Sequence, residues 1–77
     1  MMTITKDWFI KFVDYTTKTG IVYTGQLISV SYVNGLIIAN IKISQSAPRI
    51  NSIVKNIPYN ENGKNNSWKF FQKPHSS

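Results

Sequence analysis

The dipeptide Asn34-Gly35 constrains the fold more than any other feature of this sequence. Asn-Gly is the preferred pair for a two-residue type I′ turn, because both central positions need a positive φ. Residues 21–33 and 36–44, on either side, are rich in β-branched and aliphatic side chains. We therefore expect them to form the two arms of a β-hairpin. The second arm alternates, with Ile37, Ala39, Ile41 and Ile43 on one face and Asn40, Lys42 and Ser44 on the other.

A first strand is expected over residues 8–17, and Lys18, Thr19 and Gly20 resemble a turn. The apolar set of the next strand changes face near Gly25, which predicts a bulge or bend there. Together these strands make a three-stranded meander. After it, residues 59–66 form a polar loop with a turn at Asn62-Gly63, residues 67–72 a final aromatic strand, and residues 73–77 a frayed tail.

The segment near residues 47–57 is ambiguous. Its apolar residues follow the spacing of a helix face, and Ser46 and Pro48 suit a helix start. Many of its residues are poor helix formers, so a strand is an equal alternative. We favour a short helix slightly, and Pro58 ends the element in either case. The residues at helical spacing are Ile50, Ile53, Val54 and Ile57.

These patterns predict a mainly β fold: one small domain over residues 1–77, built as a bent antiparallel meander or barrel. OB-like and SH3-like barrels both fit, with at most one short helix near 47–57. A chain of 77 residues has room for one core. Its composition, 42% hydrophobic and 13% aromatic, can form that core and argues against intrinsic disorder.

The sequence gives little support for catalysis. It has no cysteine and one histidine, His75, close to its last residue, so we expect no metal site and no cofactor. The acidic residues are Asp7, Asp14 and Glu61, and no phosphate-binding loop or Gly-x-Ser-x-Gly elbow occurs. We expect a protein that is not an enzyme and has no catalytic residues.

Charge is the clearest functional signal. Nine Lys and Arg residues stand against three Asp and Glu, which gives a net charge of +6. Most of this excess follows residue 38, where six cations face one acid. Such a distribution suits phosphate backbones or acidic surfaces, although charge of this kind also serves solubility. The six cations are Lys42, Arg49, Lys55, Lys64, Lys69 and Lys73.

Aromatic rings lie among these cations, and rings with lysines are the two ingredients of single-strand binding. Trp68 and Phe70 share one face of the last strand and suit a core, whereas tyrosines at strand edges and loops, including Tyr59, often keep a wet hydroxyl. The residues expected to contact phosphate are Lys42, Arg49, Lys55, Lys69 and Lys73. The rings expected to stack on bases are Tyr23, Tyr32 and Trp68.

Residues 20–30 (GIVYTGQLISV) resemble the first conserved segment of Sm-like proteins. That family builds small bent-sheet barrels that assemble into rings and bind single-stranded RNA, so the resemblance implies a small barrel of that use. The sequence departs from the family pattern at Ser31, Gly35 and Ile50, and only seven residues precede the first expected strand. We do not assign the chain to the family on this segment.

Two functions remain. The first is a small basic module that binds single-stranded DNA or RNA through lysines on phosphates and rings on bases. The alternative is a protein-interaction module, such as a phage accessory or inhibitor protein, that binds an acidic partner through a strand edge or aromatic patch. Under either function, exposed strand edges favour a homodimer or higher homo-oligomer. We expect no membrane partner and a cytoplasmic location, because no apolar stretch is long enough for a signal or a span.

Overall fold

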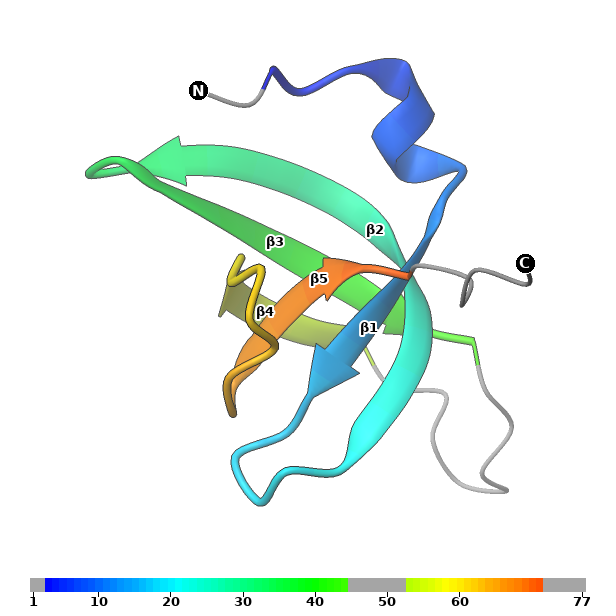
Figure 1. The fold of residues 1–77 in the computed structure, drawn as a ribbon. Coiled ribbons are helices and arrows are strands. Elements are labelled where there is room, and N and C mark those ends of the chain that lie inside the picture. The colour runs from blue at the N-terminus through cyan, green and yellow to red at the C-terminus, as the bar shows by residue number, and fades with distance from the viewer. Residues whose placement is uncertain (1–2, 45–52, 72–77) are drawn as a thin grey trace, which may run out of the picture.

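Five strands form one antiparallel sheet in the computed structural model, which describes residues 3–44 and 53–71 (Figure 1). In chain order the elements are the 3-10 helix η1 (Lys6–Phe9) and strands β1 (Phe12–Thr16), β2 (Val22–Val33), β3 (Leu36–Ile43), β4 (Ile53–Pro58) and β5 (Ser67–Phe70). The strand order is β4-β3-β2-β1-β5, so β4 and β5 are the two edges. This is a small all-β domain, as expected, but the sheet is not closed into a barrel.

The hairpin predicted from Asn34-Gly35 is confirmed. Both residues have a positive φ, 51° and 80°, and Val33 pairs with Leu36 across the turn. Gly20 also has a positive φ, 88°, and its N–H donates to the Thr17 carbonyl at 3.0 Å. The two turns therefore set the β1–β2 and β2–β3 connections as the sequence indicated.

The change of face in β2 occurs three residues after the predicted position. The register with β3 shifts between Leu27 and Ser29, so Ile28 is the extra residue of the bulge. Gly25 is needed for another reason: a Cβ there would lie 2.6 Å from the carbonyl oxygen of Lys42. Its missing side chain lets β3 approach β2 closely as β2 curves round to pair with β1 (Figure 1).

The short helix favoured near 47–57 is wrong for the residues described, because residues 53–58 form strand β4. Val54 and Ile57 pair with Ile41 and Ala39, which lie two residues apart on β3. The extra residue on β4 is accommodated at a bulge where Asn56 has a φ of 59°. Because of this bulge, Val54 and Ile57 both face the core although they lie three residues apart, a spacing that is otherwise typical of a helix. Residues 45–52, which include Ile50, lie outside the described residues.

The side chain of Asn40 on β3 holds this bulge in place. The N–H of Asn56 donates to Oδ1 of Asn40 at 3.0 Å, and Nδ2 of Asn40 donates to Oγ of Ser29 at 3.0 Å. The amide of Asn40 thus supplies a partner for the backbone of β4 and links it to β2. An unpaired strand N–H is satisfied in this way without a regular ladder bond.

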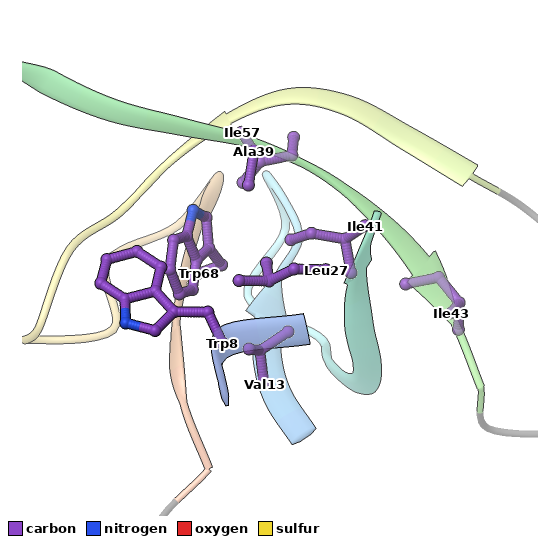
Figure 2. Close-up of a cluster of buried hydrophobic side chains, with 8 residues drawn as sticks. All are labelled: Trp8, Val13, Leu27, Ala39, Ile41, Ile43, Ile57 and Trp68. Atoms are coloured by element: carbon purple, nitrogen blue, oxygen red, sulfur yellow. The ribbon is translucent and has the colours of Figure 1, made fainter. Parts of the chain in front are cut away.

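The core lies inside the curve of the sheet (Figure 2). Trp8, expected at the start of the first strand, instead reaches this core from η1 and is 6% exposed. Strand alternation brings in the others, because residues of one parity face the same side. The buried hydrophobic residues are Trp8, Val13, Leu27, Ala39, Ile41, Ile43, Ile57 and Trp68.

An aromatic cluster of Trp8, Tyr59, Trp68 and Phe70 joins the two ends of the open sheet. The Trp68 ring centroid lies 6.1 Å from Trp8, 4.9 Å from Tyr59 and 5.2 Å from Phe70, each in an edge-to-face arrangement. Beside it, the N–H of Asn60 donates to the Trp68 carbonyl at 2.9 Å. Ring packing and one bridge thus connect the end of β4 to β5 where a full ladder would close a barrel.

The close approach at Gly25 predicts a steric cost for any side chain there. Gly25→Ala should lower the free energy of unfolding by about 2–3 kcal/mol, because overpacking against backbone cannot relax easily. Gly35→Ala is the matched control: its positive φ makes alanine strained by about 1 kcal/mol, but no atom lies within 4 Å of the added Cβ. Urea unfolding measures both, and equal costs would contradict the packing account.

Candidate nucleic-acid interface

The face of the sheet that points away from the core carries one continuous row of residues, which crosses strands β1 to β4 and includes the residue that follows β5. Phe12 pairs with Gln26, Gln26 with Lys42, and Lys42 with Ile53. On the other side of β1, the N–H of Phe71 donates to the carbonyl of Phe12 at 3.0 Å. We call this set the outer row: Phe71, Phe12, Gln26, Lys42 and Ile53.

The outer row contains two exposed aromatic rings. Phe12 is 50% exposed and Phe71 is 46% exposed, and they lie on directly neighbouring segments. Adjacent strands are about 4.8 Å apart, so the two rings project from neighbouring positions on the same face of the sheet. Neither ring belongs to the core cluster, and the exposed half of each is available to stack against another planar group.

Three of the predicted lysines lie on this same face. Lys42 belongs to the outer row, and Lys55 follows Ile53 by two residues on β4. Lys69 lies on β5, two residues before Phe71, which directly follows the end of that strand. Because alternate residues of a strand share a face, these positions lie on the side of Phe12 and Phe71. The end of the Lys69 side chain extends to Gly63 in the loop beside β5. Lys42 and Lys55 are exposed, and Lys69 is half-buried opposite Asp14. The fold therefore combines cations and rings on one surface.

The rings expected from the sequence to stack on bases are not in this surface. Trp68 is fully buried, so its ring has no free face for a base. Tyr23 is half-buried against the core, and Tyr32 is exposed but lies on the β2–β3 hairpin. Arg49 and Lys73 lie outside the described residues.

Sequence reasoning missed Phe12 and Phe71 as candidate site residues. The placement of Trp68 and Phe70 in the core required Phe71 to face outward, and that signal was present in the alternation. The position of Phe12 beside it depends on the pairing of β1 with β5, residues far apart in the chain. Nothing local in the sequence indicates that pairing.

A pocket of about 280 Å³ opens next to the edge strand β5. Its lining combines two rings with a carboxylate, an amide and an ammonium group. Lys11 adds a second cation nearby, with its Nζ 5.4 Å from the centre of the Phe70 ring. The lining residues are Tyr59, Glu61, Asn62, Lys69 and Phe70.

The loop that forms one wall of this pocket is held by hydrogen bonds to the β1–β2 turn. Nδ2 of Asn65 donates to the Lys18 carbonyl at 3.1 Å, and the N–H of Asn66 donates to the Thr17 carbonyl at 3.2 Å. Oγ of Ser67 donates to the Lys64 carbonyl within the loop. These bonds fix the polar segment 60–66 against the sheet, so the pocket is a defined feature of the fold.

Burial, with a smaller contribution from the Glu61 carboxylate, raises the pKa of Tyr59 above its ordinary value of 10.0. The phenol is therefore neutral at pH 7 and keeps a hydrogen-bonding O–H at the pocket. Within the described ranges 3–44 and 53–71, no three His, Asp, Glu or Cys side chains gather as a metal site. No helix in the same ranges is long and apolar enough to cross a membrane.

Comparisons with known proteins add no family to this description. No protein-family model matches the chain, and no curated protein or solved structure matches it. The resemblance of residues 20–30 to Sm-like proteins thus stays a local likeness of sequence. The support for the candidate interface is therefore the arrangement of its residues in the structure.

The raised pKa of Tyr59 predicts part of the loss of stability in alkali. The unfolded chain ionises this phenol near pH 10, whereas the folded chain ionises it only at higher pH. The stability that the neutral phenol contributes is therefore fully present below pH 10 and is lost as the pH rises through the folded pKa. Tyr59→Phe should reduce the fall in unfolding free energy between about pH 9 and pH 11. Glu61→Gln, which removes the smaller cause, should give an intermediate fall, and identical pH profiles for all three proteins would contradict the assignment.

Proposed function

We propose that this protein binds single-stranded nucleic acid across the outer row and is not an enzyme. The observation that carries the proposal is the pair of exposed rings, Phe12 and Phe71, on the same face of the sheet as Lys42 and Lys69. Rings provide stacking surfaces for unpaired bases, and lysines contact phosphates without regard to sequence.

The geometry favours single strands over duplexes. Bases inside a duplex are stacked on each other, so they cannot lie flat on Phe12 or Phe71. Four strand spacings separate β5 from β4, about 19 Å along the sheet, which gives several nucleotides a path from the rings to Lys42 and Lys55. Small sheets of the OB-like or SH3-like kind suit this use, since OB-folds bind oligonucleotides on a sheet face. The net charge of +6 would speed the encounter at low salt.

Removal of the two rings should weaken binding. The double variant Phe12→Ala, Phe71→Ala is expected to lose about 5- to 150-fold in affinity for a labelled thymidine octamer, because stacking contributes about 1–3 kcal/mol per base. Both rings are half exposed, so the fold should survive their truncation. Tyr32→Ala, at an exposed ring on the hairpin, is the matched control and should bind like the unsubstituted protein. Fluorescence anisotropy measures all three, and a loss with Tyr32→Ala alone would place the site on the hairpin.

The lysines should determine the dependence of affinity on salt. Lys42→Gln is expected to reduce the slope of log affinity against log salt by about 0.7, the contribution of one contact to a single-stranded phosphate. Lys6→Gln, an exposed lysine of η1 outside the outer row, removes the same charge and should leave the slope unchanged. Equal slopes for both variants would show that the charge acts only through the general field of the protein.

An exposed apolar area next to the outer row favours the second candidate function, an acidic protein partner. Phe9 and Ile10 are 38% and 73% exposed, and they precede Phe12 in the chain with Lys6 and Lys11 close in sequence. Apolar surface flanked by lysines fits a partner with apolar and acidic residues, such as a phage accessory protein would meet in its host. This candidate would be favoured by a purified partner protein whose binding persists after nuclease treatment. That partner should fail to bind the Ile10→Asp variant and should still bind the Lys42→Gln variant.

The β2–β3 hairpin is the part of the surface best suited to self-association. The sequence has no charged residue from Thr19 to Ile41, and the hairpin exposes Val33 and Leu36 by about half. Two copies of a chain with a net charge of +6 repel each other less where neither carries a charge. We therefore propose that the homodimer forms through this hairpin, with its tip turned away from the outer row.

A charged hairpin should separate the two copies. The variant Val33→Lys, Leu36→Lys is expected to sediment as a monomer at concentrations where the unsubstituted protein sediments as a dimer. Both positions are exposed, and they flank a turn whose Asn-Gly pair is unchanged, so folding should not depend on them. A monomeric unsubstituted protein, or a double variant that remains dimeric, would contradict the proposed dimer surface.

A further inference from the structure

Glu61 occupies an unexpected position for a protein that binds phosphates. It is the one acidic residue after Asp14, in a stretch that carries seven cations, and it lines the pocket beside β5 together with Lys69. A carboxylate repels a phosphate group, so the pocket is unsuited to the nucleic-acid backbone. It suits instead a neutral group that donates hydrogen bonds, because an ionised carboxylate only accepts them.

We propose that this pocket takes one unpaired guanine base of the strand bound on the outer row, with the Glu61 carboxylate accepting from the base. The proposal rests on the proposed function and adds a base preference to it. The Watson–Crick edge of guanine presents two adjacent donors, N1–H and the N2 amino group. Adenine, cytosine and thymine each present one donor there beside an acceptor, so a carboxylate with two acceptor oxygens matches guanine best.

The lining supplies the remaining contacts that a guanine base needs. Tyr59 and Phe70 provide ring surface, with their centroids 6.4 Å apart and their planes at 50°, and both belong to the packed aromatic cluster. The side-chain amide of Asn62 can donate to the O6 acceptor of the base. The N–H of Asn62 donates to Oδ1 of Asn60 at 2.9 Å, which fixes the turn that carries Glu61 and Asn62.

Size and connection to the outer row agree with one base. A volume of about 280 Å³ is many times the roughly 30 Å³ share of a water molecule, and it lies just below the range of pockets for drug-sized ligands. Lys69 joins the two sites: its backbone position faces outward beside Asp14, and its side chain lines the pocket. The end of that side chain would be 3.4 Å from a Cβ at Gly63, so it lies along the loop. A phosphate on Lys69 therefore has its base within reach of Glu61.

The raised pKa of Tyr59 is consistent with this arrangement. Part of the shift comes from the negative charge of Glu61, which requires the carboxylate to be near the phenol. The raised pKa keeps the Tyr59 phenol protonated, so its O–H can take part in hydrogen bonds with a bound base. Lys11, over the other ring of the pocket, adds a cation for a neighbouring phosphate.

The test compares thymidine octamers that differ at one central position, occupied by thymine, guanine, hypoxanthine or adenine. Hypoxanthine is guanine without the N2 amino group, so it removes one of the two proposed donors. The unsubstituted protein should bind the guanine octamer about 5-fold or more tightly than the other three, the smaller end of the discrimination that a two-bond base contact supplies. Fluorescence anisotropy at fixed salt measures each affinity.

Glu61→Gln should remove this preference, with all four octamers bound within about 2-fold of one another. The matched control is Asp7→Asn, which changes the net charge equally on the exposed η1 and should retain the preference for guanine. A Glu61→Gln variant that still prefers guanine, or an unsubstituted protein that binds all octamers equally, would overturn the pocket assignment and leave the proposed function intact. No binding of any octamer would instead contradict the proposed function itself.

Discussion

Burial of the Trp68 ring between β5 and the end of β4 is the contact on which the rest of the structure depends. The sheet is not closed, and within the described ranges 3–44 and 53–71 Tyr59 and Trp68 form an isolated bridge between its two edges. The fully buried ring of Trp68 lies where these two edges meet and packs against Trp8, Tyr59 and Phe70. A domain of this size without disulfides has a marginal core, so one large buried ring contributes a large share of it.

This packing also determines which residues face outward. With Trp68 and Phe70 directed to the core, Lys69 and Phe71 must project on the other side of β5. The same bridge positions the loop that carries Glu61 beside the strand. The arrangement has a cost, because Nε1 of Trp68 is buried without an acceptor among the described residues, and an unsatisfied buried donor costs about 1–3 kcal/mol.

The sequence predicted those parts of the fold that local chemistry specifies. Asn34-Gly35 predicted its hairpin because few other residues adopt a positive φ twice in succession. The helix near 47–57 was wrong because the bulge at Asn56 changes the spacing of core residues, and that bulge depends on the side chain of Asn40 in another strand. Lys42, Lys55 and Lys69 could be predicted as surface cations, whereas the pairing of Phe12 with Phe71 depends on a long-range register that no local pattern encodes.

The central claim is that single-stranded nucleic acid lies on the outer row, and its most direct test is the map of backbone amide shifts on a thymidine octamer titrated into isotopically labelled protein. We expect the largest shifts at Phe12, Gln26, Lys42 and Phe71, which share one face across four neighbouring segments of the sheet. The amides of residues 32–36 at the hairpin tip should remain unchanged at protein concentrations that keep the oligomeric state fixed. Shifts confined to the hairpin, or no saturable shifts at low salt, would contradict the account.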